Sequence, residues 1–587
     1  MTEMYLRFLN VLSKKRKYQL FLVFLFISLN GLAEMISLAS VIPFLSIINN
    51  PKNLWNHPFT QKIAPILNLS SPEELIIPAT ILFISSAIIS GIFRTFNIWF
   101  QGYVGSEIGQ ELGKKAIFKK INQPYNIHIN ENSSEVIARL NGDINCVVLF
   151  FEKSFYILTA FIISIFILTT IFLIEWKVSL ILGFLFISIY FLISSVTRSK
   201  LKENGKKLKE ANISLIKTIQ ESVGSIRDII LSNSQGYYVR EFSYFDGIIK
   251  KKRFKNYFYT SSPRYLMESV GLTLIGVFSV VMVKKLGQIN SIIPVLGAFA
   301  LGAQKLLPSF QLIYSSVASL FADKYFLESA LRILEQPDLK VHNLNNLEPY
   351  KLKNSIVIQE LTFKYPNQKR KVLDNVNLEI KKGERIGLIG KTGSGKSTVL
   401  DLIIGLIEPS GGTISVDNKN LHKLDIFKKS WLKNIGHVPQ NIFLTDDSIC
   451  SNIALGIPKE EIDIKRIKEV IKLAQLESFI NELKYGIYTI VGERGSRLSG
   501  GQRQRIGIAR ALYHSHKNLL VLDEATSALD KKTESEIITS INNLSRDLTI
   551  IVISHRLSAL NLCDKIFQLK KAKLKEIKDI NEINLYD

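Results

Sequence analysis

The sequence predicts two domains, an N-terminal all-α domain of six membrane-spanning helices and a C-terminal α/β domain built around a mostly parallel sheet. Three observations lead to this fold class. Long apolar runs recur before residue 320, hydropathy falls after about residue 325, and short β-rich runs then alternate with helical patterns. We place the membrane domain at 1–325, a linker at 326–353 and the α/β domain at 354–587.

The six apolar runs each approach the length of about 20 residues that a helix needs to cross a bilayer. They lie near 19–48, 75–101, 152–174, 178–197, 264–284 and 289–317. The loops that follow the second and fourth runs read as helices that continue out of the membrane. Because 47% of the 587 residues are hydrophobic, a disordered chain is excluded.

Charge position predicts how the chain crosses the membrane. The net charge of +23 comes largely from clusters such as 14–17 and 198–209, which flank predicted spans. Lysine and arginine collect on the cytoplasmic side, so we expect a multi-pass protein of the inner or plasma membrane with a cytoplasmic N-terminus and a cytoplasmic α/β domain. The basic balance then reflects membrane orientation, and no nucleic-acid partner is expected. The three widely separated cysteines make a disulfide scaffold or a cysteine zinc site improbable.

Four charged residues fall inside or at the edge of the predicted spans: Glu34, Arg94, Arg264 and Lys305. Charged groups are costly in lipid, so they usually face a cavity or a partner. We predict them as substrate-cavity residues, with Arg264 and Lys305 forming a basic wall for an anionic substrate. Helix pairing, or a side chain that reaches the membrane surface, is the alternative for each of them.

The strongest motif of the second domain is GKTGSGKS at 390–397, directly after the apolar strand RIGLI. Its glycines let backbone N–H groups approach phosphates, at the positive end of the helix that follows. Lys396 is expected to reach the β- and γ-phosphates, and Ser397 to bind Mg²⁺. The predicted ATP-binding residues here are Gly390, Lys391, Thr392, Gly393, Ser394, Gly395, Lys396, Ser397 and Thr398.

Two further motifs complete this chemistry. The apolar strand in LLVLDEATSALD, 519–530, ends in Asp523 and Glu524. Asp523 is expected to hold the magnesium ion and Glu524 to orient or deprotonate the attacking water. The segment LSGGQRQR, 498–505, starts a helix and offers a second anion site at Ser499, Gly500 and Gly501. The alternative interpretation of this segment is a simple glycine loop with a serine cap.

Together these motifs resemble the nucleotide-binding domain of ATP-binding cassette (ABC) transporters, over essentially all of 354–570. The resemblance implies that the signature residues of one subunit close on ATP held by the other. It implies an adenine-stacking aromatic, a glutamine at the magnesium ion and water, a residue that links the two sites, and a histidine at the γ-phosphate. The matching residues are the signature set Ser499, Gly500, Gly501 and Gln502, then Tyr365, Gln440, Asp530 and His555 in that order. The implied catalytic residues are Glu524, His555, Gln440 and Lys396, and the implied metal ligands are Ser397, Gln440 and Asp523.

Six spans ahead of one cassette resemble an ABC exporter half-transporter, which implies a homodimer, or less readily a heterodimer, that hydrolyses ATP. The segment 291–310 and the surface segment after the first span resemble bacterial flippases for lipid-linked oligosaccharides. The resemblance implies that a polyisoprenyl pyrophosphate oligosaccharide, or a similar amphipathic substrate, moves from the inner to the outer leaflet of the bilayer.

Two alternatives stay open at this point. One is an ABC exporter of another lipid, a drug or a peptide. The other, from a different class, is a non-transport ABC ATPase that acts on ribosomes or DNA. Proteins of that class share the signature and a basic charge but lack membrane spans.

Overall fold

The computed structural model describes residues 2–577 apart from 50, 56–59, 62–63, 66–68, 175, 287–288, 338–346, 367, 369, 515–516, 527 and 562. Within helices, the backbone alone is described at 281–286, at 289–300 and at a few other positions. The chain divides into two compact units. The first consists of Met1–Gln123 and Asn130–Leu339, and the second of Pro124–Ile129 and Lys340–Asp587.

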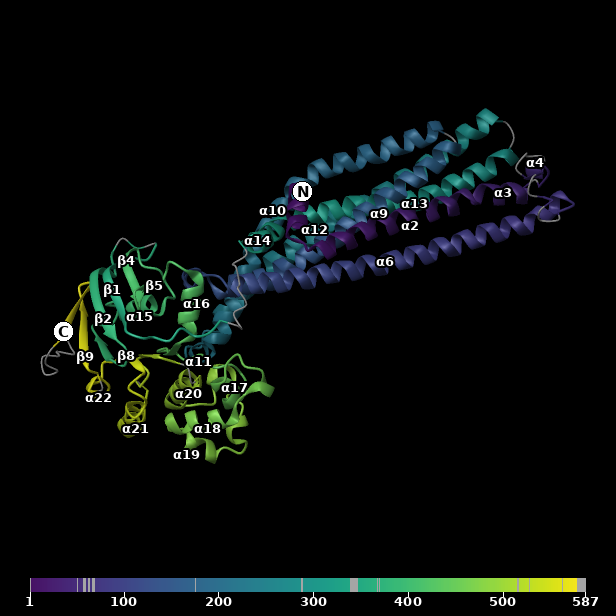
Figure 1. Cartoon of the computed structure of the whole chain (residues 1–587). Coiled ribbons are helices and arrows are strands. Elements are labelled where there is room, and N and C mark those ends of the chain that lie inside the picture. Colours follow the sequence, from purple (N-terminus) through teal and green to yellow (C-terminus); the bar gives the residue numbers. More distant parts are fainter. Residues whose placement is uncertain are drawn as a thin grey trace. The chain divides into compact units, whose positions relative to one another are not determined.

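The first unit is helical (Figure 1). In chain order the helices of the N-terminal part are α1 (Thr2–Val11), α2 (Lys14–Ala39), α3 (Val41–Asn49), α4 (Pro51–Trp55), η1 (Pro72–Leu75), α6 (Ile76–Ile121), α7 (Tyr125–Asn130), α8 (Ser133–Ile137), the π-helical turn η2 (Ala138–Asp143), α9 (Ile144–Ile174), α10 (Trp176–Gly224), α11 (Ile226–Leu231), α12 (Gln235–Leu286), α13 (Ile289–Ala322) and α14 (Lys324–Leu334). Of these, α7 belongs to the second unit apart from Asn130. The predicted continuation of the spans into long helices is therefore observed in α6, α10 and α12.

Within the described residues, four helical segments are long and apolar enough to cross a membrane: Lys14–Ile48, Pro72–Ile121, Ser133–Leu173 and Gly183–Gly224. They correspond to the first four predicted spans. The fifth and sixth predicted spans fall in α12 and α13, where several side chains lie outside the described residues. In the surface segment expected after the first span, residues 56–59, 62–63 and 66–68 lie outside the described residues, and for 291–300 the backbone alone is described.

Helix α6 exposes apolar side chains and buries polar ones, as a helix in a lipid bilayer does. It exposes Ile77, Ile81 and Ile92, each more than 60% accessible, and buries Asn97 and Gln101. The Gln101 amide donates hydrogen bonds to Asn97 Oδ1, at 3.1 Å, and to the Thr159 hydroxyl of α9, at 2.9 Å. Apolar side chains outside and paired polar side chains inside are the arrangement that a bilayer favours.

The boundary between the units lies later than the sequence suggested. Residues 326–353 were expected to form a linker, but α14 occupies the first part of this range and ends at Leu334. Leu327, Ala330 and Leu331 are buried at helical spacing in the core of the first unit. The polar face of this amphipathic helix lowers the average hydropathy, which is why it reads as a linker. Residues 338–346 of the expected linker lie outside the described residues.

The second unit contains two sheets. One is antiparallel, in the order β2-β1-β4-β5, and the other has the order β10-β9-β3-β8-β7-β6, with β9, β3, β8, β7 and β6 parallel. The strands are β1 (Ser355–Phe363), β2 (Leu373–Lys381), β3 (Arg385–Ile389), β4 (Gly411–Val416), β5 (Lys419–Asn420), β6 (Ile435–Val438), β7 (Leu519–Asp523), β8 (Thr549–Ile553), β9 (Lys565–Lys570) and β10 (Lys573–Ile577). Strands β3 and β8 are buried throughout, as parallel strands covered on both faces should be.

Helices of the second unit form two groups. Helix α15 packs into the core of the sheets, whereas α17, α18 and α20 build a separate apolar core (Figure 1). The helices are α15 (Lys396–Ile404), α16 (Asp425–Lys433), α17 (Ile449–Ile453), η4 (Lys459–Glu461), α18 (Ile464–Leu473), α19 (Glu477–Glu482), η5 (Gly486–Tyr488), η6 (Glu493–Gly495), α20 (Gly500–Tyr513), α21 (Lys531–Asn542) and α22 (Leu557–Leu560). The predicted α/β domain is confirmed.

A close approach between α10 and α13 gives a test of the first unit. A Cβ atom at Gly205 would lie 1.9 Å from the carbonyl oxygen of Ala322. We expect Gly205→Ala to reduce the free energy of unfolding by about 1–3 kcal/mol, because the backbones must separate. Gly247→Ala is the matched control, since no described atom lies within 4 Å of its added methyl group. Thermal unfolding in detergent compares the two, and equal midpoints would contradict this packing.

Candidate functional site

Four parallel strands bring the predicted site residues to one edge of the large sheet. Residues 390–395 follow β3, Glu524 follows β7, His555 lies just after β8 and Gln440 just after β6. Parallel strands end together, so segments far apart in sequence meet at their carboxyl ends. This edge is where ligands bind in α/β sheets of this kind.

The loop at 390–395 takes a shape that only glycine adopts readily. Gly390, Gly393 and Gly395 have φ angles of 154°, 77° and 107°. A Cβ atom at Gly390 would lie 2.6 Å from the carbonyl oxygen of Leu569, and one at Gly395 would lie 2.6 Å from Val372. The loop leads directly into α15, so its backbone N–H groups lie at the start of that helix. Loops of this kind at helix starts bind phosphate.

Lys396 closes this loop on itself. Its ammonium group donates hydrogen bonds to the carbonyl oxygens of Gly390, at 2.6 Å, and Lys391, at 3.1 Å. The side chain is buried, and desolvation lowers its pKa while the charges of Glu524 and Asp523 oppose that shift. A cation held at the mouth of an N–H-lined loop is suited to an anionic ligand.

Asp523 lies beside this loop. Burial raises the pKa of its carboxyl group, and a hydrogen bond from the Ser397 hydroxyl works in the opposite direction. The hydroxyl and the carboxylate thus already lie together, as the metal prediction requires. Thr398, the next residue of α15, has its hydroxyl 3.1 Å from that of Tyr365, whose ring packs edge-on against Phe363.

Glu524 connects the predicted catalytic residues. Its Oε2 accepts a hydrogen bond from the Gln440 amide at 2.8 Å, and its Oε1 lies 3.3 Å from His555 Nε2. Its φ angle of 48° is unusual for a residue with a side chain. Strained backbone of this kind persists where surrounding structure holds it, often at functional sites. Three predicted residues from three strands are therefore in contact.

A cavity of about 500 Å³ opens at the glycine loop, with His555 and 390–394 among its lining residues. Five cations also line it: Arg370, Lys371, Lys391, Lys570 and Lys571. Of these, only Lys391 was identified from sequence. Lys570 and Lys571 lie in the tail FQLKKAKLKEI, which lacks a glycine turn. In its place, Lys571 and Ala572 both adopt positive φ angles, 51° and 61°, to join β9 to β10.

The signature residues form a second group. Ser499 caps α20, because its hydroxyl accepts a hydrogen bond from the backbone N–H of Gln502 at 3.2 Å while its own N–H donates to Gln502 Oε1 at 2.8 Å. Added Cβ atoms at Gly500 and Gly501 would each lie 3.3 Å from Ala528 atoms. Among the described residues, no hydrogen bond or ion pair joins Ser499 to the glycine loop.

Asp530 and the ion pair of Glu534 with Arg556 hold the segment that follows Glu524. Asp530 caps α21 by accepting a hydrogen bond from the Thr533 N–H at 3.0 Å, which lowers its carboxyl pKa. Glu534, only 2% exposed, accepts hydrogen bonds from Thr526, at 2.9 Å, and from Arg556, at 2.8 Å. Sequence analysis missed Glu534 because nothing in its neighbours marks an acidic residue that will be buried.

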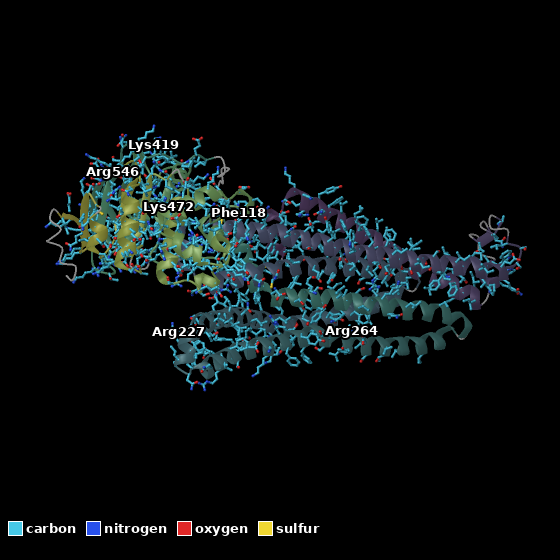
Figure 2. All side chains as sticks on the ribbon, turned by 90° about the horizontal axis from the view of Figure 1, so that it is seen from below. Phe118, Arg227, Arg264, Lys419, Lys472 and Arg546 are labelled. Atoms are coloured by element: carbon cyan, nitrogen blue, oxygen red, sulfur yellow. The ribbon has the colours of Figure 1, made fainter. Side chains whose placement is uncertain are left out.

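The predicted substrate-cavity residues lie in the first unit. The ammonium group of Lys305 contacts the carboxylate of Glu34. Arg264 lies on α12 (Figure 2) and donates a hydrogen bond to Glu268 at 2.7 Å, with both side chains largely exposed. Arg94 on α6 is exposed. The structure therefore brings Lys305 and Glu34 together, and it shows no described contact that joins Arg94 or Arg264 to them.

Comparison with known families decides the class. Residues 20–290 match the family described as ABC transporter transmembrane region, and residues 373–527 match the family described as ABC transporter. The chain is an ABC half-transporter. Its membrane-embedded domain precedes an ABC ATPase domain that binds ATP. The transmembrane match contradicts the alternative of a non-transport ATPase of ribosomes or DNA.

The half-transporter is similar to proteins of several kinds. It is 38% identical over 246 residues to ABC transporter B family member 29, chloroplastic, of Arabidopsis thaliana, which is 42% of this chain and 37% of that protein. It is 39% identical over 245 residues to the alpha-hemolysin translocation ATP-binding protein HlyB of Escherichia coli, covering 42% and 34% of the two chains. The match thus spans only about a third of the length of these relatives.

Two comparisons extend over most of the half-transporter. The ATP-dependent lipid A-core flippase of Wigglesworthia glossinidia brevipalpis is 27% identical over 524 residues, which is 88% of this chain and 87% of that protein. The structure of a bacterial Atm1-family ABC exporter with ATP bound superposes with a TM-score of 0.77 at 20% identity, covering 95% and 94% of the two chains. The latter shows that the fold is that of an ABC exporter.

Asp401 on α15 gives a pH test of this region. Burial, and then the charge of Asp523, raises the pKa of its carboxyl group from 3.8 to about 6. The folded state thus binds the proton more tightly than the unfolded state, so stability is lost as pH rises from about 4 to about 6. We expect Asp401→Asn to raise the free energy of unfolding at pH 7 by at most about 3 kcal/mol.

The gain should shrink as pH falls through 6, because the native carboxyl group is then protonated and as neutral as the amide. Thermal unfolding of the full chain between pH 5 and 8 measures this dependence. Asp446→Asn, at an exposed loop position, is the control. A pH-independent effect of Asp401→Asn would contradict the role of burial.

Proposed function

We propose that this half-transporter is an ATP-driven exporter that works as a homodimer and moves an amphipathic, lipid-linked anion out of the inner leaflet of the bilayer. The observation that carries the proposal is the division of the ATPase residues into two groups. One group surrounds the glycine loop, and the other is the capped helix start at Ser499, which no described contact joins to it. A second copy of the chain would supply the missing half of each site.

The first group would bind the triphosphate. The N–H groups of 390–395 and of the start of α15 would bind the phosphates, and Lys396 would exchange its contacts with the Gly390 and Lys391 carbonyls for phosphate oxygens. Arg370, Lys371, Lys570 and Lys571 add positive charge around the cavity. Tyr365, whose hydroxyl lies beside Thr398, would stack on the adenine ring.

A magnesium ion fits the residues beside this loop. Mg²⁺ prefers oxygen ligands and usually takes one or two carboxylates together with substrate phosphates. Ser397 and Asp523 already share a hydrogen bond, and Gln440, whose amide nitrogen donates to Glu524, would offer its amide oxygen. Within the described residues no cluster of three or more His, Cys, Asp or Glu could hold a metal ion, so phosphate oxygens would complete the ligand set. When bound, the ion would neutralise charge that develops on the phosphates.

Glu524 would act as the general base for the attacking water. Gln440 and His555 hold its two carboxylate oxygens, so the group is oriented before ATP arrives. His555 lines the cavity and could turn from Glu524 to the γ-phosphate. Ser499 and the amides of Gly500 and Gly501, from the partner copy, would close the other side of the phosphate and exclude water.

ATP bound between two copies would favour their association, and hydrolysis would remove the shared phosphate contacts. This shift between two states is what drives alternating access, because a ligand moves an equilibrium only by binding one state better. The half-transporter would lie in the inner or plasma membrane with its basic clusters on the cytoplasmic side. Its N-terminus and its ATPase domain would then be in the cytoplasm.

A lipid-linked anion is the favoured substrate for a specific reason. The relative that matches 88% of the chain, membrane domain included, is a lipid A-core flippase. The alpha-hemolysin translocation protein matches only 42%. Substrate is bound by membrane helices, so the longer match bears more on its identity. A polyisoprenyl pyrophosphate oligosaccharide is the specific candidate, and another lipid, a drug or a peptide is the alternative.

Glu524→Gln tests the proposed base. We expect ATP to bind as in the wild type and hydrolysis to fall by about 100-fold or more, because the amide cannot accept the proton. Nucleotide binding and phosphate release by purified protein in nanodiscs measure the two effects. Glu482→Gln, at an exposed position outside the site, is the control. Hydrolysis at the wild-type rate would remove Glu524 from this role.

Translocation tests the substrate. Proteoliposomes that contain a fluorescent polyprenyl pyrophosphate oligosaccharide should lose accessible label on one leaflet only when ATP is hydrolysed, and Glu524→Gln should abolish the movement. A fluorescent phosphatidylcholine should not move. If ATPase activity is normal but the pyrophosphate lipid stays in place, this substrate is wrong, and transport of a drug or peptide would then support the alternative.

A further inference from the structure

The ion pair between α2 and α13 has an unusual composition. Glu34 is the one acidic residue in the sequence of α2, and Lys305 is the one charged residue in that of α13. Their charged groups are in contact. Because charged side chains are costly at membrane depth, single opposite charges on two helices should pair. Lys305, the residue predicted to receive an anionic substrate, thus already has an anionic partner from the same chain.

The two ends of this pair differ in access. The Glu34 side chain is 7% exposed, whereas that of Lys305 is 36% exposed. Leu38, one turn after Glu34, and Leu306, next to Lys305, belong to a buried apolar cluster with residues of α9. Helices α2, α9 and α13 run side by side there (Figure 1). An incoming anion can therefore reach the ammonium group, while the carboxylate stays enclosed among apolar side chains.

Asn30 offers the carboxylate a second position. It is fully buried on α2, and in the described part of the chain neither its amide nitrogen nor its amide oxygen has a hydrogen-bond partner. A buried polar group without a partner costs about 1–3 kcal/mol, so such a group calls for an explanation. Asn30 precedes Glu34 by four residues, which places the two side chains on the same helix face. The N–H groups of the Asn30 amide can donate hydrogen bonds to a carboxylate.

We propose that Glu34 is the resident counter-ion of Lys305 and that a phosphate group of the transported amphiphile replaces it, while the Glu34 carboxylate turns to the Asn30 amide. This inference rests on the proposed function and assigns its selectivity. A phosphate or pyrophosphate has several charged oxygens to offer Lys305, whereas an uncharged lipid has none. The pair thus favours anionic lipids over uncharged ones. The return of Glu34 to Lys305 would also help the anion to leave.

The test uses the full chain in phosphatidylcholine nanodiscs and a polyprenyl pyrophosphate as the probe, with the uncharged polyprenol as its control. The measured quantity is the pyrophosphate concentration that half-saturates stimulation of ATP hydrolysis. Glu34→Gln should lower it by about threefold to tenfold, the range that contacts between membrane helices usually span, because Lys305 loses its competitor. Asn30→Ala should raise it, because the displaced carboxylate has no partner. Opposite shifts from two neighbouring buried positions are not expected of general damage to the fold.

Two further variants keep the test decisive. Lys305→Gln leaves Glu34 buried and unpaired and could destabilise the protein, so Glu34→Gln with Lys305→Gln removes both charges at nearly constant shape. This double variant should lose the preference for pyrophosphate over polyprenol. Glu203→Gln is the matched control, because it removes an exposed Glu–Lys pair with Lys207 on α10 and should leave the half-saturating concentration unchanged.

The outcomes separate the two proposals. If the wild-type protein responds to pyrophosphate and the Glu34 and Asn30 variants do not shift, or shift in the same direction, the counter-ion exchange is wrong and the exporter proposal stands. If the double variant keeps its preference for pyrophosphate, the exchange is likewise wrong. If the wild-type protein itself ignores pyrophosphate, the proposed substrate fails and the exchange fails with it.

Discussion

The parallel pairing of β3, β8, β7 and β6 is the constraint on which the ATPase site depends. Parallel neighbours end at the same edge, so the glycine loop, Glu524, His555 and Gln440 meet although 165 residues of sequence separate Gly390 from His555. Each of these residues is brought to the site by the strand that ends just before it. A shift of one residue in any pairing would carry its side chain to the other face of the sheet and away from the others.

Several residues at the same edge have unusual backbone conformations. Gly390, Gly395 and Glu524 adopt positive φ angles there, as do Lys571 and Ala572 in the β9–β10 turn. Rigid neighbours hold these conformations in place, as the close approaches of Leu569 to Gly390 and of Val372 to Gly395 show. Strain held by a packed sheet keeps the phosphate loop and the Glu524 carboxylate in place before any ligand binds.

The membrane unit is arranged for lipid surroundings and not for water. Apolar side chains are exposed along α6, and several polar side chains are buried: Gln101, Ser86 and Glu34 each contact a polar side chain elsewhere in the unit. Bilayer lipid offers no hydrogen bonds, so polar groups buried in the unit are stabilised when they pair with one another. At the Lys305–Glu34 contact, the Lys305 side chain remains 36% exposed, whereas Glu34 and the unpartnered Asn30 are buried.

The sequence by itself determined the ATPase motifs and the apolar spans, because both depend on short-range patterns. Local sequence is enough to predict three features: the glycine loop, the strand that leads to Asp523 and Glu524, and the apolar runs. Only the tertiary structure decided that Lys570 and Lys571 line the cavity, that Glu534 is buried against Arg556, that α14 belongs to the first unit, and that Lys305 pairs with Glu34. These are contacts between residues far apart in the chain or between an amphipathic helix and its partners, and no local pattern encodes which distant side chain will be there.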